Sequence, residues 1–276
     1  MKRFQAGVTL IVILLVLIAI TVIGGLAVRS SISSLKIATV SQAQQLLIQN
    51  SDAALFNVED PTQLVRSMAL NGMFGYLKGD ANSGKELVFC YKSGNGQFFN
   101  FHNASLLSWN GANVINSGLG TNGFCKVDTG FFTSGRNTVI TQIAIKAVDT
   151  SELADFQHMQ KGTDADSIKK DPAQMYTVYA TSIFPGLANS SVANLNDKIK
   201  DCFSQRMNGL PKSKEDELDL EILKTTASTT LTNEEKAAKL SDLNNVKITV
   251  SGCLSSLGVP THTQVARYAL MDYVTK

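Results

Sequence analysis

An uncharged apolar segment near the N-terminus constrains this chain more than any other feature. Residues 8–28 read VTLIVILLVLIAITVIGGLAV, and only Thr9 and Thr21 are polar among these 21 positions. At about 1.5 Å of rise per residue, a helix of this length is just long enough to span a hydrocarbon core of about 30 Å. We therefore expect residues 8–28 to cross a membrane as a single helix.

The charges beside this segment predict its orientation. Lys2 and Arg3 precede it and Arg29 follows it. Basic residues on a short N-terminal side place that side in the cytoplasm, so the rest of the chain would be exported. An ordinary signal anchor would show the same pattern. A cleaved secretory signal fits less well, because its apolar region is about 7–15 residues long and ends at a small-residue cleavage site.

Helical sequence continues beyond Arg29. No proline occurs before Pro61, and no glycine occurs between Gly25 and Gly72. Apolar residues recur at helical spacing as far as Ala54, with Gln and Ser between them. We therefore expect one helix over residues 8–57, apolar all round in its first half and amphipathic in its second. The amphipathic half needs a protein surface to cover one face.

The residues before the apolar segment carry a resemblance to a known family. The sequence K-R-F-Q-A-G followed by V-T-L-I-V resembles the class III leader of type IV pilins and pseudopilins. In that family a membrane peptidase cleaves after the glycine and methylates the new N-terminus. The resemblance implies cleavage and N-methylation between Gly7 and Val8. It divides the chain into a leader (1–7), a long helix (8–57) and a periplasmic pilin head (58–276).

The apolar segment departs from the major pilins at one telling position. Val12 occupies the fifth mature position, where major pilins carry a glutamate that pairs with the N-terminal amine of a neighbouring subunit. Val8 also replaces the more usual Phe or Met. In lacking this glutamate, the chain resembles PilX-type minor pilins and the K-type pseudopilin of type II secretion. Both are placed at or near the filament tip.

Later segments resemble the PilX-type minor pilins of twitching-motility pili. These segments are NSDAALFNVEDPTQLVRSMALNGMFGY, ELVFCY, NGFCKV and SGCLSSLGVP…ARYAL. The resemblance implies a subunit of the bacterial inner membrane, with a single-pass helix and a periplasmic head, which then enters the surface pilus. It would prime pilus assembly or lie at the tip, supporting twitching motility, DNA uptake or adhesion. Its partners would be other minor pilins, the major pilin, the prepilin peptidase and the inner-membrane assembly platform.

Four cysteines lie in the exported part: Cys90, Cys125, Cys202 and Cys253. An even number in an exported domain indicates two disulfides, and three connectivities are possible. We favour Cys90–Cys125 and Cys202–Cys253, because each pair closes a local lobe. Four buried thiols are the alternative, and the cysteine and histidine spacing does not suggest a zinc site.

The pattern of residues 58–276 predicts an α+β head in which an antiparallel sheet of five to seven strands packs on the long helix. This agrees with the type IV pilin-like fold that the resemblance implies. We expect a short helix over 62–70 and strands over 86–92, 97–101, 137–148, 175–184, 246–250 and 266–274. Long loops are expected between the end of the second strand at residue 101 and residue 135, and over 150–171. We expect helices over 193–207, 213–224 and 233–243, the last two forming a small inserted hairpin. The last helix starts with Thr232-Asn233-Glu234-Glu235, a capping-box pattern.

The exported part carries no recognisable catalytic motif, so we expect a structural protein without cofactor or metal. The loop GDANSGKE departs from a phosphate-binding loop at Glu86, where Ser or Thr would stand. Asp164 and Asp166 do not complete a calcium ligand set. His102 is expected on a strand. The formal charge of +2 falls to zero once Lys2 and Arg3 are removed, which gives no support to nucleic-acid binding by this subunit alone.

Two other functions stay open from the sequence. A K-type pseudopilin of type II secretion shares the missing glutamate, but its larger inserted domain usually brings acidic calcium ligands. A signal-anchored periplasmic enzyme would keep its N-terminus uncleaved or be cleaved elsewhere, and would need a pocket of convergent polar groups.

Overall fold

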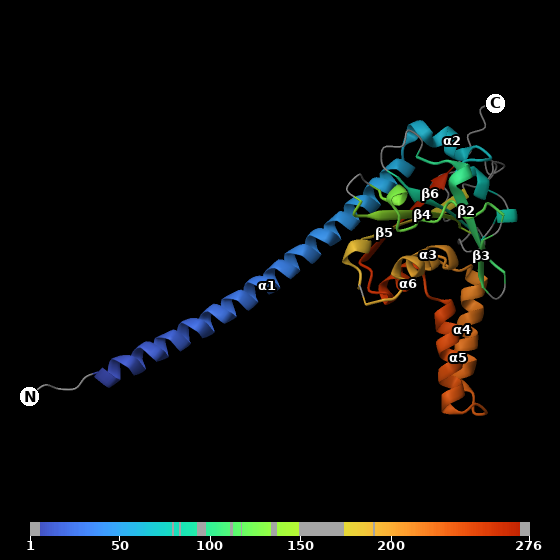
Figure 1. The fold of residues 1–276 in the computed structure, drawn as a ribbon. Helices are drawn as coiled ribbons and strands as arrows, with labels where there is room; N and C mark the ends of the chain where they lie inside the picture. The colour runs from blue at the N-terminus through green and yellow to red at the C-terminus, as the bar shows by residue number, and fades with distance from the viewer. Residues whose placement is uncertain are drawn as a thin grey trace, which may run out of the picture. The chain divides into compact units, whose positions relative to one another are not determined.

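The computed structural model describes residues 6–270, apart from residues 79, 83, 93–97, 111–112, 117, 134–136, 149–173 and 190. The chain forms two compact units, the first comprising residues up to Gln45 and the second beginning at Leu46 (Figure 1). The first unit is helical throughout its described residues. The second is the α+β head.

Helix α1 runs from Ala6 to Val58, which confirms the single long helix expected over 8–57. Its end is set by the sequence Asp60-Pro61, because a proline disfavours helical backbone at the preceding residue. Asp60 has φ −59° and ψ 111°, and its carboxylate accepts a hydrogen bond of 2.9 Å from the backbone N–H of Thr62. A 3₁₀ turn (Pro61–Gln63) and the short helix α2 (Leu64–Met68) follow, as expected.

The head contains a six-stranded sheet in which every neighbouring pair of strands is antiparallel, within the range of five to seven expected. The strand order is β3-β2-β1-β4-β5-β6. The strands are β1 (Glu86–Tyr91), β2 (Ala104–Trp109), β3 (Val114–Asn116), β4 (Ile140–Ala147), β5 (Gln174–Ile183) and β6 (Thr261–Leu270). Together with α1 this sheet gives the α+β, pilin-like architecture that the sequence predicted.

Both faces of the sheet are covered by other parts of the head. Successive side chains of a strand point to opposite faces, so each strand contributes to two cores. On one face, Phe89 and Ile143 pack in the core that contains Leu55 and Val58 from the last turns of α1. On the other, Val88 and Ile140 pack on residues of the later helices. These helices are α3 (Leu195–Gln205), α4 (Lys212–Ala227), α5 (Asn233–Val246) and α6 (Val250–Ser256).

Helices α4 and α5 form the expected inserted hairpin, and Figure 1 shows them lying side by side. The predicted start of α5 is confirmed by a full capping box. Thr232 Oγ1 accepts from the backbone N–H of Glu235 at 3.3 Å, and the Glu235 carboxylate accepts from the backbone N–H of Thr232 at 2.9 Å.

The expected strand over 97–101 is wrong where the structure describes it. Phe101–Asn103 is a 3₁₀ turn, which places His102 on a turn and not on a strand. Asn100 caps this turn by accepting a 3.0 Å hydrogen bond from the backbone N–H of His102, a local contact that competes with strand formation. The partner of β1 is instead β2, which with β3 lies in the region expected to form loops.

The expected strand over 246–250 is also wrong. Val246 ends α5, and Val250 begins α6 behind the N-cap Thr249, whose hydroxyl accepts from the backbone N–H of Gly252 at 3.2 Å. Cys253 therefore lies on helix α6. The last strand, β6, begins five residues earlier than the expected 266–274, and residues 271–274 lie outside the described part of the chain.

Candidate functional site

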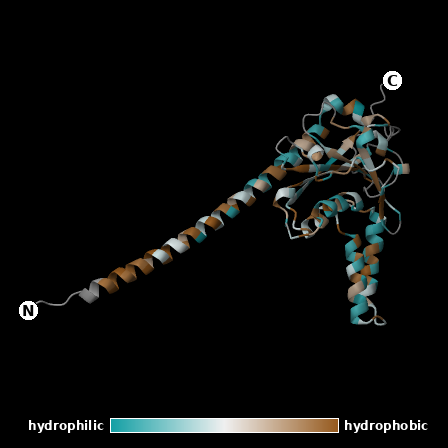
Figure 2. Cartoon of the chain, in the orientation of Figure 1, coloured by the Kyte–Doolittle hydropathy of each residue, from teal (hydrophilic) through white to brown (hydrophobic). Residues whose placement is uncertain are grey.

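The apolar part of α1 is exposed around its whole circumference. Four consecutive residues, which lie about 100° apart around the helix, are all exposed: Leu10 by 70%, Ile11 by 60%, Val12 by 52% and Ile13 by 64%. One 18-residue window has mean hydropathy 3.1 and none of it is buried, so α1 is long and apolar enough to cross a membrane (Figure 2). Burying each large apolar side chain contributes about 1.5–3 kcal/mol. This segment therefore requires lipid or a packed bundle of similar helices.

The expected processing position lies at the start of this helix. Gly7 and Val8 are in helical backbone, in the first turn of α1, and residues 1–5 lie outside the described part of the chain. No described contact distinguishes the bond between Gly7 and Val8 from its neighbours. Cleavage and N-methylation there remain a prediction.

Gly24 and Gly25 lie within α1, although each costs about 1 kcal/mol relative to alanine in a helix interior. A Cβ atom added at either position would meet nothing within 4 Å. Packing within the described chain therefore does not require these glycines. Two explanations remain: close approach of a helix from another molecule, or a weak point at which α1 unwinds.

Two disulfides stabilise the head, and they have the favoured neighbour pairing. Cys90 is bonded to Cys125 with a Cα–Cα distance of 5.0 Å, and Cys202 to Cys253 with 5.6 Å. The alternative of four free thiols is wrong. The second disulfide joins α3 to α6, which lie together on one face of the sheet.

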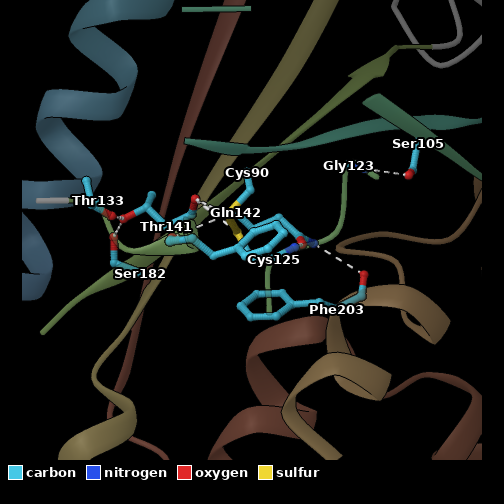
Figure 3. Close-up of a disulfide and its surroundings, with 10 residues drawn as sticks. Cys90, Ser105, Gly123, Cys125, Thr133, Thr141, Gln142, Ser182 and Phe203 are labelled. Atoms are coloured by element: carbon cyan, nitrogen blue, oxygen red, sulfur yellow. Dashed lines mark hydrogen bonds between the residues drawn. A yellow bond between two sulfur atoms is a disulfide. The ribbon is translucent and has the colours of Figure 1, made fainter. Parts of the chain in front are cut away.

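Hydrogen bonds of Gln142 connect the first disulfide to the helices below it (Figure 3). The backbone N–H of Cys125 donates to Gln142 Oε1 at 3.1 Å, and Gln142 Nε2 donates to the carbonyl oxygen of Phe203 at 3.3 Å. Gln142 is 2% exposed, so β4 carries a buried amide that satisfies polar groups on both sides. The loop of Cys125 is thereby fixed to both β4 and α3.

Glu86 is a buried residue whose role the sequence did not reveal. Its side chain has no exposed surface, and its carboxylate accepts hydrogen bonds from the backbone N–H groups of Asn208 and Gly209 at 2.9 and 3.0 Å. Lys146, its cross-strand partner, donates at 2.9 Å to the carbonyl oxygen of Leu210. These bonds fasten the segment that leads into α4 to the sheet. The strand periodicity, which puts Glu86 on the same face as Val88, was the only available signal.

Burial raises the pKa of the Glu86 carboxyl above its ordinary value. The two backbone N–H groups, the charge of Lys146 and the side-chain amide of Asn208 oppose this shift but do not cancel it. The Glu86 carboxyl has a structural role, since its described hydrogen bonds all go to Asn208 and Gly209, in the segment that leads into α4.

The described residues contain no group of three His, Cys, Asp or Glu side chains able to hold a metal ion. Asp164 and Asp166 lie outside the described residues. His102 is exposed and forms no described catalytic arrangement. The features that stand out are thus an exposed apolar helix and a head stabilised by disulfides and buried polar contacts.

No family model, curated protein or solved structure matches this chain. The function is therefore inferred from the residues and their geometry.

Proposed function

We propose that this chain is a PilX-type minor pilin that primes assembly of a type IV pilus. One observation carries the proposal: a single helix, α1, is apolar on all sides over Leu10–Val28 and buries its last turns, including Ala54 and Val58, in the core of an α+β head. The apolar part of this helix suits a membrane before assembly and the interior of a filament afterwards. The head supplies contacts with neighbouring subunits.

Exchange between these two environments has a simple physical basis. Lipid tails and apolar side chains are equally apolar, so transfer of α1 from lipid into a bundle of helices depends on packing and not on water. Val12 leaves the described apolar segment without the carboxylate that would pair with a neighbouring N-terminal amine. A subunit without this carboxylate has no buried acid that requires a neighbour's amine, which fits a place at the tip, where one neighbour is missing.

The test is the mature N-terminus of the protein extracted from membranes, measured by mass spectrometry with and without the prepilin peptidase. We expect N-methylated Val8 only when the peptidase is present. Gly7→Val should block cleavage, because the peptidase needs close approach to the backbone, whereas the matched variant Gln5→Ala should be processed normally. An intact Met1, or a cut near Ala27, would contradict the proposal and favour an anchored or secreted periplasmic protein.

Processing does not separate a minor pilin from a pseudopilin, so a second measurement is needed. Surface pili are counted by electron microscopy in a deletion strain that carries either the wild-type gene or Gly7→Val. The proposal requires pili in the first case and few or none in the second. Normal piliation without the protein, together with calcium-dependent melting of the head, would favour the K-type pseudopilin.

A further inference from the structure

A pocket of about 340 Å³ opens in the head where β1 ends. Its wall is formed by Lys92, which follows β1, by the segment around Asn100, and by the loop that contains Lys126 and Phe131. Small-molecule sites in proteins have volumes of about 300–1,000 Å³, so this pocket is at the lower end of that range. None of the described residues that line it belongs to the apolar part of α1.

Two lysines give this pocket a positive charge. Lys92 Nζ lies 4.5 Å from the centroid of the Phe131 ring, and Lys126 Nζ lies 5.7 Å from the same centroid. The described residues that line the pocket include no carboxylate, and neither lysine forms an ion pair with a described residue. Two ammonium groups that face one ring without a counter-ion among the described residues favour an anionic ligand between them.

Amide groups and aromatic rings complete the lining. The side-chain amides of Asn103 and Asn122 are exposed and make no hydrogen bond with any described residue. Asn100 uses its carbonyl oxygen to cap the turn at His102, which leaves its two N–H donors available. Such amides suit hydroxyl groups, which both donate and accept.

Aromatic rings provide the apolar surface of the pocket. Phe98 and Phe131 are partly exposed there, and Phe98 is held edge-on against the buried ring of Phe89, with centroids 5.5 Å apart. A partly exposed ring offers a flat surface to a ligand that carries C–H groups on one face. Charge, amides and rings in one small pocket together describe a ligand that is acidic, rich in hydroxyls and flat on one side.

The disulfide Cys90–Cys125 pre-organises this arrangement. Lys92 lies two residues after Cys90, and Lys126 directly follows Cys125. The two segments are 35 residues apart in sequence at the cysteines, so the bond brings both ammonium groups to one place before any ligand arrives. Fixing groups in their bound positions lowers the entropic cost of binding.

We propose that this pocket binds a carboxylated sugar, as found in acidic glycans. The carboxylate lies between Lys92 and Lys126, the hydroxyls contact the asparagine amides, and a ring face lies on Phe98 or Phe131. Nucleic acid fits less well, because the pocket has two cations in a confined volume and the mature chain has no basic excess to follow a phosphate backbone.

The test uses the full-length protein in detergent micelles and isothermal titration with glucuronic acid. Glucose is the matched probe, because it differs only in carrying a neutral hydroxymethyl group where glucuronic acid carries the carboxylate. We expect glucuronic acid to bind at least about tenfold more tightly than glucose, since a charge-assisted hydrogen bond is about twice as strong as a neutral one. Lys92→Gln and Lys126→Gln should each weaken glucuronic acid binding about tenfold, whereas Lys198→Gln, on the exposed face of α3, should leave it unchanged.

Asn122→Ala is a second kind of variant, because it keeps both lysine charges. It should weaken the binding of glucuronic acid and of glucose by the same factor, since both sugars carry the hydroxyls that the amide would contact. Unchanged thermal unfolding of each variant would show that the head is intact. Equal binding of glucuronic acid and glucose, or no binding of either, would overturn the proposal. Binding of inorganic phosphate as tightly as glucuronic acid would also overturn it and indicate a simple anion site. Tighter, lysine-dependent binding of single-stranded DNA would overturn it in favour of nucleic acid.

Discussion

Asn208 donates hydrogen bonds from both its backbone N–H and its side-chain amide to the carboxylate of Glu86, at 2.9 and 3.2 Å. The two residues are 122 positions apart in sequence. Glu86 begins β1, and Asn208 lies between α3 and α4. The inserted hairpin is therefore joined to the centre of the sheet by a buried polar contact as well as by apolar packing.

Removing this carboxylate should destabilise the head. Glu86→Ala leaves the backbone N–H groups of Asn208 and Gly209 without their acceptor, which we expect to cost about 2–4 kcal/mol in the free energy of unfolding. Glu86→Gln keeps one oxygen acceptor and should cost about 1–2 kcal/mol. The measurement is urea unfolding of the full chain in detergent, followed by the fluorescence of Trp109, the single tryptophan. Asp216→Asn, on the exposed face of α4, is the control, and an equal effect of all three variants would contradict the role of Glu86.

The cost of Glu86→Gln should also depend on pH. Because burial raises the pKa of Glu86 in the folded state, the folded protein holds this proton more tightly than the unfolded chain does. The stability contributed by Glu86 is thus fully present below its ordinary pKa of 4.5 and is lost as pH rises through the folded value. The amount by which wild type exceeds Glu86→Gln in unfolding free energy should therefore be largest near pH 4.5 and should shrink at higher pH. A difference that grows with pH would mean that the hydrogen bonds outweigh burial.

A chain of buried hydroxyl groups joins the last turns of α1 to the sheet. Ser51 Oγ lies 3.3 Å from Ser182 Oγ, which lies 2.8 Å from Thr141 Oγ1, and Thr133 donates to Thr141 at 3.1 Å. Ser182→Ala removes the middle of this chain and should cost about 1–3 kcal/mol, because its neighbours lose a partner in a buried site. Ser255→Ala, at an exposed position of α6, should change stability by less than about 0.5 kcal/mol. Equal urea midpoints for the two variants would argue against the hydroxyl chain.

The sequence predicted those parts of the fold that depend on local signals. Helix α1 followed from an uninterrupted apolar and then amphipathic pattern that ends at Pro61, and α5 followed from its capping box. The long strands β4 and β5 followed from their alternating, β-branched residues. In each case the residues that decide the structure lie within a few positions of one another.

One error, the strand expected over 97–101, missed a local signal, the cap of Asn100 on the turn at His102. The other errors arose where distant residues decide the structure. The segment that contains Val250 has strand-forming residues, yet Thr249 caps a helix there that packs against α3 through the disulfide of Cys253. Strand β2 is short and lies among Asn and Gly residues, and only its register with β1 identifies it. The contact of Glu86 with Asn208 and the meeting of Lys92 with Lys126 likewise depend on the tertiary fold.

The disulfide between α3 and α6 should contribute strongly to stability. It closes a loop of 51 residues, and disulfides of this kind contribute about 2–4 kcal/mol, chiefly by restricting the unfolded chain. The double variant Cys202→Ala/Cys253→Ala should lose about that amount in urea unfolding. In the wild type, the disulfide Cys90–Cys125 closes a loop of 35 residues. Loop entropy alone therefore predicts that Cys90→Ala/Cys125→Ala lowers the free energy of unfolding by only about 0.3 kcal/mol less than the first double variant does. Unfolding of the wild type that is insensitive to reductant would contradict both expectations.

A charge at the centre of the apolar segment should separate the function of α1 from the stability of the head. Ile18 is the middle residue of the segment 8–28, and an arginine there costs about 2.5–3.5 kcal/mol in a membrane helix. We expect Ile18→Arg to lower the fraction of protein retained in membranes after alkaline extraction and to abolish pili at the cell surface. Ile18→Leu, which keeps size and polarity, should behave as wild type.

The head provides the internal control for this experiment. Ile18 belongs to the first compact unit and Trp109 to the second, so Ile18→Arg should leave the urea midpoint of Trp109 fluorescence unchanged. Unchanged stability with lost membrane retention would place the defect in the apolar helix alone. If Ile18→Arg were retained in membranes and supported normal piliation, the apolar segment would be neither a membrane anchor nor a filament core, and the proposed assembly role of α1 would fail.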